Sequence, residues 1–390
     1  MINKLRGNTL VNLVIFLGVL GILLSCSPKK DTKNLLFIGS YTNGQPSEGL
    51  YVYDFDINSG KTKELFVLDS IVNPSFITLS PDGKYLYTVT KSQMKVNGMI
   101  AAFAVDSVKG ALHFLNEEDA GGRNPVHLAI SNEGSYLVNS NYTDPSISVF
   151  KIKDDGSLNP YSQLLKFKDS SIVSGRQDNS HIHSTNFSSA NDYLFAQDLG
   201  ADKIRAFNFF PNTTTNHFLK SIESNTVTMK PGSGPRHFTF HPISKFAYGI
   251  SELSGRISQY NYGKGSLTFK RDYQSYTNKQ KLYRSADIHI SPDGKFLYAS
   301  NRAPDENSLS IFAVDILTGN LKLVGREPTY GEHPRNFVID PSGNYIIVAN
   351  QFSDNVVFFK RDLKTGKLTK LPNELKIKNP SSLRMKSYNQ

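Results

Sequence analysis

A phrase of alternating apolar and polar residues recurs seven times along the chain. In each copy a short alternating strand precedes a turn, which is often of the Ser-Pro-Asp-Gly kind, as in NPSFITLSPDG and RSADIHISPDG. Pro, Asp and Gly suit successive turn positions, and the alternation is typical of a strand with two different faces. The copies begin at Asn73, Asn124, His181, Gly234, Arg284, His333 and Asn379. A period of about 50 residues predicts one structural unit per copy.

A second alternating segment follows the first one in six of the seven copies. Examples are YLYTVTK, FAYGISE and FLYASNR. Two further strands complete most units, as in residues 309–324, LSIFAVDILTGNLKLV, where Thr-Gly-Asn supplies a hairpin turn. Four short strands per unit are the signature of propeller blades, so we predict an all-β chain built as a seven-bladed propeller.

The two ends of the chain predict how the ring closes. Residues 35–42, LLFIGSYT, match the second strand of a blade, whereas the last copy, at Asn379, is a first strand with no successor. We therefore expect the seventh blade to combine the C-terminal strand with residues 35 to about 70. Such joining leaves no open sheet edge, and it makes residues 35–390 one domain.

The first 34 residues have a different pattern and are left out of the predicted fold. Lys4 and Arg6 precede an apolar stretch, residues 11–24, which ends in LLSC at Cys26. This arrangement resembles a bacterial lipobox, so residues 1–25 are predicted to be a lipoprotein signal peptide and residues 26–34 a polar tether. The alternatives are a plain signal peptide or a membrane-spanning anchor, for which an apolar stretch of about 14 residues is short. The lipid on Cys26 would anchor the chain to a bacterial membrane in the cell envelope, facing the periplasm or the surface.

Composition excludes several kinds of chemistry. The 390 residues are 38% apolar and 20% charged, so the chain can bury a large core. Cys26 is the single cysteine, which leaves no disulfide, zinc cluster or thiol nucleophile for the folded part. The net charge is +10, but no dense run of Lys and Arg is interleaved with aromatic residues, so a nucleic-acid partner is not expected.

The period-2 pattern separates packing positions from candidate site positions. The fifth and seventh residues of most copies are apolar, as in Ile77 and Leu79, and should pack between blades. The first four residues carry charge instead, and so do the last residues of the second strands, which return to the same face. Because these positions differ from blade to blade, we expect them to surround a ligand. The residues are His127, His181, His183, Arg236, His237, Glu252, Arg284, Asp287, Asn301, Arg302, His333 and Arg335.

Some of these residues have a structural alternative. His127 and His237 could hydrogen-bond to neighbouring blades, and Arg284 could form an ion pair with Asp287 between blades. The sector that holds Arg236, Glu252 and Arg302 is the stronger candidate for function.

At these residues the chain resembles the seven-bladed lactonase family, which includes 6-phosphogluconolactonases and carboxymuconate-lactonising enzymes. The resemblance rests on GSGPRHFTFHPISKFAYGISEL, HIHSTNF, RSADIHISPDGKFLYASNR and HPRNFVIDPSGNYIIVANQ. It implies a catalytic set of His183, Arg236, Glu252 and Arg302, with no cofactor and no metal. A calcium site like that of another propeller lactonase class would have to use Glu252, Asp198, Asn141 and Asn301.

The implied activity is hydrolysis of a sugar lactone, phosphorylated or not. Glu252 or His183 would take a proton from water, while Arg236 and Arg302 would hold the oxyanion and an acidic group of the substrate. We expect His127, His237, Asp287, Arg335 and Asn301 to contribute to substrate binding. The alternatives are a propeller that binds sugar acids, glycans or a protein without turnover, and a lyase or cycloisomerase.

Overall fold

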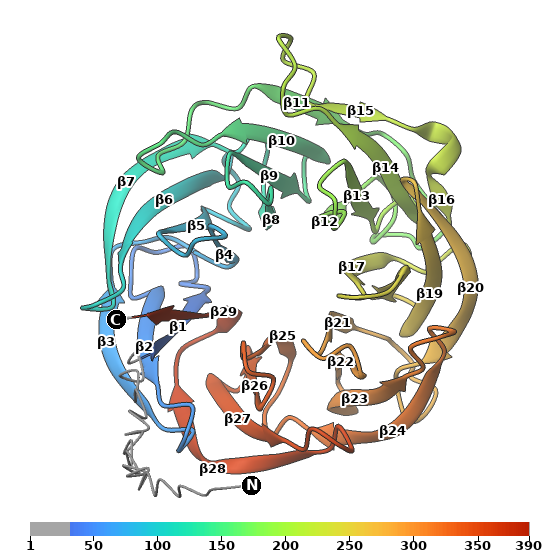
Figure 1. The fold of residues 1–390 in the computed structure, drawn as a ribbon. Coiled ribbons are helices and arrows are strands. Elements are labelled where there is room, and N and C mark those ends of the chain that lie inside the picture. The colour runs from blue at the N-terminus through green and yellow to red at the C-terminus, as the bar shows by residue number, and fades with distance from the viewer. Residues whose placement is uncertain (1–31, 390) are drawn as a thin grey trace, which may run out of the picture. The chain divides into compact units, whose positions relative to one another are not determined.

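The computed structural model describes residues 32–389, which form a closed ring of seven β-sheets (Figure 1). The predicted seven-bladed propeller is confirmed. The signal peptide and Cys26 lie outside the described residues. Among residues 32–389 the helical content is one 3-10 turn, η1 (Glu223–Asn225), and no helix there is long and apolar enough to cross a membrane.

Each sheet runs from an innermost strand beside the axis to an outermost strand at the rim. The first three complete sheets are β4 (Ile77–Leu79), β5 (Tyr85–Thr90), β6 (Met99–Asp106), β7 (Ala111–Asp119); β8 (Pro125–Ile130), β9 (Tyr136–Asn141), β10 (Ser146–Lys151), β11 (Gln163–Lys166); and β12 (Ile182–Phe187), β13 (Tyr193–Asp198), β14 (Lys203–Phe209), β15 (Leu219–Ser221), with β16 (Val227–Thr228) also on β14.

The next three sheets repeat this order. They are β17 (Pro235–Phe240), β18 (Phe246–Ser251), β19 (Arg256–Gly263), β20 (Ser266–Gln274); β21 (Ser285–Ile290), β22 (Phe296–Ala303), β23 (Glu306–Val314), β24 (Leu321–Pro328); and β25 (Pro334–Ile339), β26 (Tyr345–Asn350), β27 (Asn355–Arg361), β28 (Leu368–Lys376).

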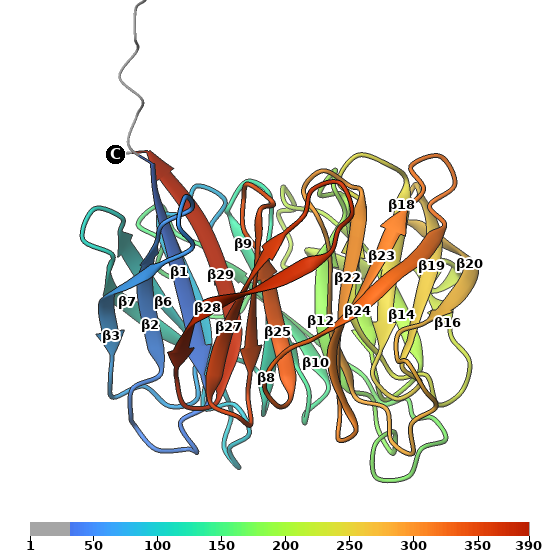
Figure 2. The same cartoon turned by 90° about the horizontal axis from the view of Figure 1, so that it is seen from below.

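The seventh sheet joins the two ends of the described chain, as the sequence predicts. It consists of β29 (Pro380–Asn389), β1 (Thr32–Ser40), β2 (Leu50–Phe55) and β3 (Thr62–Leu68). Strands β1 and β29 are antiparallel and pair from Thr32 opposite Asn389 onwards (Figure 2). The pairing reaches further than expected, because β29 is ten residues long and extends β1 back into residues that the sequence interpretation gives to the tether.

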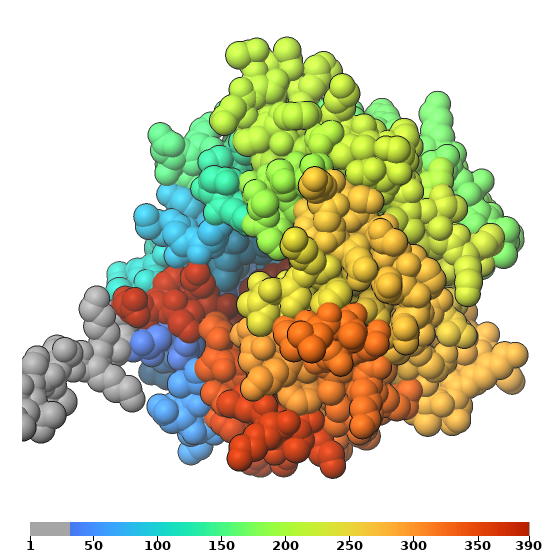
Figure 3. Space-filling model, turned by 45° about the vertical axis from the view of Figure 1, so that its right-hand side comes forward, coloured from blue at the N-terminus to red at the C-terminus, as the bar shows by residue number. Residues whose placement is uncertain are grey.

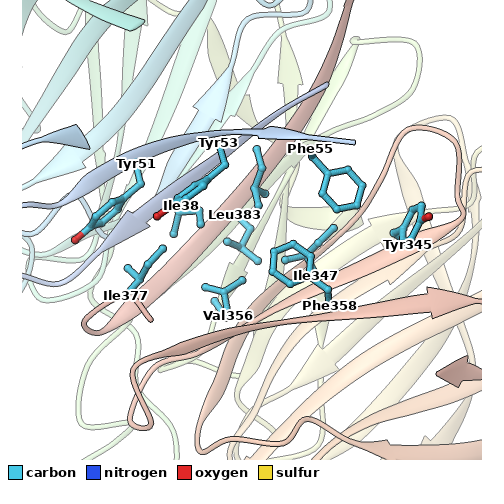
Figure 4. Close-up of a cluster of buried hydrophobic side chains, with 12 residues drawn as sticks. Ile38, Tyr51, Tyr53, Phe55, Tyr345, Ile347, Val356, Phe358, Ile377 and Leu383 are labelled. Carbon is cyan, nitrogen blue, oxygen red and sulfur yellow. The ribbon is translucent and has the colours of Figure 1, made fainter. Parts of the chain in front are cut away.

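The core lies between adjacent blades. In Figure 4, Tyr53 and Phe55 of β2 meet Ile347 of β26 and Phe358 of β27, so apolar side chains join the closing sheet to its neighbour. The rings of Phe55 and Phe358 are stacked with centroids 5.9 Å apart. The expected packing positions Ile77 and Leu79 lie in the corresponding layer on the other side of the closing sheet. Such burial is the main stabilising term of a fold without disulfides.

A β-bulge near the start of each inner strand from β8 to β29 sets the direction of the axial side chains. The pairing of β17 with β18 shifts between Pro235 and His237, so Arg236 has no partner on the neighbouring strand. The same shift leaves His183 unpaired in β12 and Arg335 unpaired in β25. A bulge re-aims the extra side chain, so the third and fourth residues of a copy both line the axial channel. The sequence reveals charge at these positions but not the bulge.

Candidate active site

The axial channel contains two pockets joined by a narrow neck. The mouth pocket, of about 160 Å³, lies where the inner strands begin and is lined by Gln93, Asn124, Val126, Tyr142, Arg176, His183, Glu252, Arg302 and Arg335. The distal pocket, of about 330 Å³, lies where the inner strands end. The neck between them has a volume of about 10 Å³, and its lining includes His183, Arg236, His237 and Asn336. Figure 3 shows one face of the molecule hollowed near the axis.

Glu252 is the centre of the mouth pocket. One carboxylate oxygen, Oε2, accepts hydrogen bonds from Arg236 Nε at 3.0 Å and Arg302 Nη2 at 2.7 Å. The other, Oε1, accepts from Arg176 Nη2 at 2.5 Å. Burial alone would raise the pKa of Glu252, but the guanidiniums of Arg302, Arg236 and Arg176 hold it well below its usual range. Glu252 is therefore a permanent carboxylate that orients three cations.

The two predicted catalytic arginines are fixed by further bonds. Arg236, which is 2% exposed, also donates from Nη1 to the carbonyl oxygen of Ala286 at 2.5 Å. Burial, with the nearby charge of Arg302, lowers the pKa of Arg236 to about 9, so it is still a cation at neutral pH. Arg302 donates from Nη1 to Nε2 of His333 at 2.6 Å. The Nε hydrogen of Arg302 is buried and has no acceptor among residues 32–389, while other atoms of the side chain line the mouth pocket.

His183 differs from the arginines because nothing in the described chain binds its ring nitrogens. Its Nδ1 is buried without a hydrogen-bond partner, and the imidazole contacts Tyr142 and His237 through their rings, at centroid distances of 5.7 and 5.3 Å. Burial, followed by the charge of Arg236, lowers the pKa of His183 well below its usual value. The imidazole is therefore neutral at pH 7 and can accept a proton.

Arg335 completes the cationic lining from the next sector. It donates from Nη2 to the hydroxyl of Tyr41 at 3.0 Å, and its guanidinium lies over the Tyr41 ring. Arg335 has no ion-pair partner within residues 32–389, because Glu252, the carboxylate of the pocket, is bound by the other three arginines. The mouth pocket and the neck together thus hold four arginines against one carboxylate, which favours an anionic ligand.

Arg176 is a site residue that the sequence interpretation missed. It comes from the insertion between β11 and β12, which lies at the mouth because an inner strand begins there. Gln177, fully buried, fixes this loop by donating from Nε2 to the carbonyl oxygen of Leu199 at 2.8 Å. The signal in the sequence was the spacing of the copies, which is longest between Asn124 and His181 and so places extra chain at this face.

The other predicted binding residues lie elsewhere in the channel or off it. His127 and Asp287 line the distal pocket, and His237 lines both that pocket and the neck. Asn301 is fully buried in its sheet, where its amide bonds to Ser275, Ser308 and Ser310, so it does not reach the mouth pocket and is a structural residue.

The ion pair considered between Arg284 and Asp287 is absent from the described residues. Asp287 instead accepts from His237 Nδ1 at 2.7 Å and from His289 Nε2 at 2.9 Å. His237 thereby links two blades, as its structural alternative supposes. The imidazole of His181 stacks on Tyr142, and that of His333 accepts a hydrogen bond from Arg302.

The residues named for a calcium site have other partners. Asp198 accepts from Arg205 at 2.9 and 2.8 Å, and Asn141 donates to the carbonyl oxygen of Ala120 at 2.7 Å. Within residues 32–389 no three His, Cys, Asp or Glu side chains form a group that could hold a metal ion.

Comparison with known proteins places this site in a family. Residues 35–385 match the family described as lactonase, 7-bladed beta-propeller. A 6-phosphogluconolactonase of Formosa agariphila is 53% identical over 90% of this chain and 99% of its own length. That of Bacillus subtilis is 31% identical over 90% of this chain and 97% of its own.

Solved structures agree with the sequence relatives. The periplasmic gluconolactonase PpgL of Pseudomonas aeruginosa has a TM-score of 0.85 and 34% identity, covering 91% of this chain and 99% of its own. The chain therefore belongs to the seven-bladed β-propeller lactonase family.

Proposed function

We propose that this protein is a carboxylic-ester hydrolase that opens sugar lactones in the mouth pocket. The observation that carries the proposal is the convergence of a neutral, unpartnered His183 with Glu252 and its three arginines. The names of the relatives, 6-phosphogluconolactonase and gluconolactonase, support the same substrate class.

The reaction needs an activated water and stabilisation of the negative charge that develops on the carbonyl oxygen. In our proposal His183 takes the proton of the attacking water, since Glu252 is too weak a base when three guanidiniums surround it. The guanidinium of Arg302, which lines the mouth pocket, stabilises the oxyanion. The ring oxygen leaves as an alkoxide, which is protonated from the imidazolium, and the product is an aldonic acid.

An anionic substrate also improves the base. The charge of Arg236 contributes to the low pKa of His183, so a bound phosphate or carboxylate that neutralises the arginines raises that pKa towards neutrality. The catalyst is then poised only when an acidic substrate is present. This favours a phosphorylated lactone over a neutral one.

The proposal is tested by following proton release from 6-phosphogluconolactone and δ-gluconolactone with the purified full-length chain. Spontaneous hydrolysis is subtracted with a protein-free reaction, Glu252→Gln is the test variant, and Glu223→Gln, which changes an exposed carboxylate in η1, is the matched control. Turnover that Glu252→Gln loses and Glu223→Gln keeps is the expected result. Equal rates with and without protein for both lactones would remove the proposal and leave a propeller that binds sugar acids without turnover.

We further propose that the chain is anchored in the cell envelope by a lipid on Cys26, as the LLSC motif indicates. The wild-type chain grown with labelled palmitate should carry the label in its membrane fraction. Cys26→Ser should carry none, and label retained by that variant would contradict the anchor.

A further inference from the structure

The distal pocket has the composition of a second binding site. It lies beyond the neck, and its polar lining comes from the fourth and sixth residues of several copies. These residues are His127, Asn186, His237, Thr239, Asp287, His289, Asn336 and Arg384. A volume of about 330 Å³ suits a small molecule, whereas the neck of about 10 Å³ admits at most one water. A sugar acid therefore cannot pass from one pocket to the other.

Arg384 is the cation of this pocket, and it is poorly compensated. Its guanidinium donates from Nη1 to the neighbouring carbonyl oxygen of Leu383 at 2.7 Å and lies over the ring of Phe76 at 4.9 Å. Within residues 32–389 it has no ion pair with any carboxylate, since Asp287 is engaged by other groups. The remaining N–H groups of the fork match a carboxylate in geometry.

Two neutral side chains add unused hydrogen-bonding groups. The Thr185 amide donates to Nδ1 of His127 at 3.4 Å, so the proton of this neutral imidazole is on Nε2, which has no acceptor among the described residues. The amide of Asn186 makes no hydrogen bond there, and its Oδ1 is buried. Asn186 is half-buried and lines the pocket, so its unpartnered amide N–H groups can donate to a hydroxylated ligand.

The charge of the pocket selects the ligand class. Arg384 contributes one positive charge and Asp287 one negative charge, while burial keeps His127 and His237 neutral by lowering the pKa of each. One guanidinium suits a monoanion and gives little support to a phosphate dianion. We propose that the distal pocket binds a small hydroxy carboxylic acid, with its carboxylate on Arg384 and its hydroxyls on Asn186 and the Nε2 hydrogen of His127.

The chain contains no tryptophan, so one introduced tryptophan reports on one place. Phe187→Trp puts it in the distal pocket, and Phe352→Trp puts it beside His333 at the mouth, where Phe352 stacks on that imidazole at 3.9 Å. Full-length protein with either reporter is titrated with D-gluconate, with gluconamide, which lacks the charge, and with inorganic phosphate.

The expected result is a saturable change in the emission of the Phe187→Trp reporter with gluconate, at least tenfold weaker with gluconamide. Adding Arg384→Gln should weaken the response at least tenfold, while Arg384→Lys should weaken it less. An unchanged unfolding temperature of Arg384→Gln shows that the loss is not misfolding. The emission change needs no turnover, so this experiment tests the distal pocket independently of the lactonase proposal.

Three outcomes would overturn the assignment. One is a flat emission from the Phe187→Trp reporter up to saturating gluconate. Another is a response that persists unchanged in Arg384→Gln. The third is a stronger response to phosphate than to gluconate, which would make the pocket a phosphate site. A gluconate response confined to the Phe352→Trp reporter would place binding at the mouth alone.

Discussion

The two pockets of the channel are built from the same repeat and yet differ in charge. At the mouth three arginines bind Glu252 and Arg335 adds a fourth cation, whereas the distal pocket has Arg384 and an Asp287 that imidazoles already engage. Burial alone would raise the pKa of Asp287, but His289 and His237 hold it well below its usual range. The repeat thus fixes where side chains point, and single substitutions within it decide what each end of the channel binds.

The largest expected effect falls on the mouth alone. Arg302→Ala removes the bonds to Glu252 and His333 and the guanidinium that lines the mouth pocket, so kcat/KM for 6-phosphogluconolactone should fall by about 10²–10³-fold. Arg271→Ala, an exposed arginine on β20, is the control that should keep full activity. If Arg302→Ala retains wild-type kcat/KM, the mouth pocket is not where the lactone reacts.

Acid tests the buried histidine that lines the distal pocket and the neck. Burial lowers the pKa of His237 to about 4. Between pH 6.5 and 4 the His237 imidazole is therefore protonated in the unfolded chain and neutral in the folded one. Folded stability is therefore full above pH 6.5 and is lost as the pH falls, by about 3 kcal/mol from His237 alone at pH 4.

Denaturant unfolding between pH 7 and 4 measures how steeply the free energy of unfolding falls with pH. His237→Gln should flatten it relative to wild type, and His113→Gln, an exposed histidine on β7, should leave it unchanged. Equal slopes in wild type and His237→Gln would mean that His237 is not kept neutral by the fold.

Replacing Arg176 should affect the KM of a phosphorylated lactone more than that of a neutral one. Arg176→Gln removes the rim cation, whose side chain is 34% exposed, and should raise KM for 6-phosphogluconolactone about tenfold. The KM for δ-gluconolactone should change less, because this lactone has no phosphate. Arg176→Lys keeps the charge and should recover part of the affinity, and equal effects on both lactones would assign Arg176 to positioning Glu252 only.

Salt should give the smallest effect and the most direct comparison of the two ends. Raising the ionic strength from about 0.02 to 0.3 M should increase KM for 6-phosphogluconolactone several-fold, because screening weakens the field of the arginines. The gluconate affinity of the Phe187→Trp reporter should change by less than about twofold. A larger salt effect at the distal pocket than at the mouth would contradict the charge assignment.

The sequence predicts the ring because the repeat shows itself seven times. It also predicts the sector of Arg236, Glu252 and Arg302, since these charged residues stand at positions whose residue type differs from copy to copy, whereas packing positions are apolar in most copies. It does not reveal the bulge, and so it groups His127, His237 and Asp287 with the mouth, although the fourth residue of each copy points deeper into the channel. The alternation also does not show that Asn301 is buried, because its partners Ser275, Ser308 and Ser310 lie outside its own strand.

Loop residues are the hardest to predict. Arg176 has no counterpart in the other copies, so no periodicity marks it, and its position depends on the buried amide of Gln177. Arg384 is a related case, since it occupies a sixth position where other copies have small, polar or apolar side chains, such as Thr78, Ala129 and Val338.

The shared sheet of β1 and β29 makes the described chain almost a circle. Thr32 and Asn389 are directly opposite in one ladder, so a short linker could join these two residues without moving a blade. The chain could then be opened at an exposed turn such as residues 214–216. Such a circular permutant would keep all seven sheets, with β14 and β15 now contributed by opposite ends of the chain, so the closing blade would become an ordinary one and another blade would close the ring.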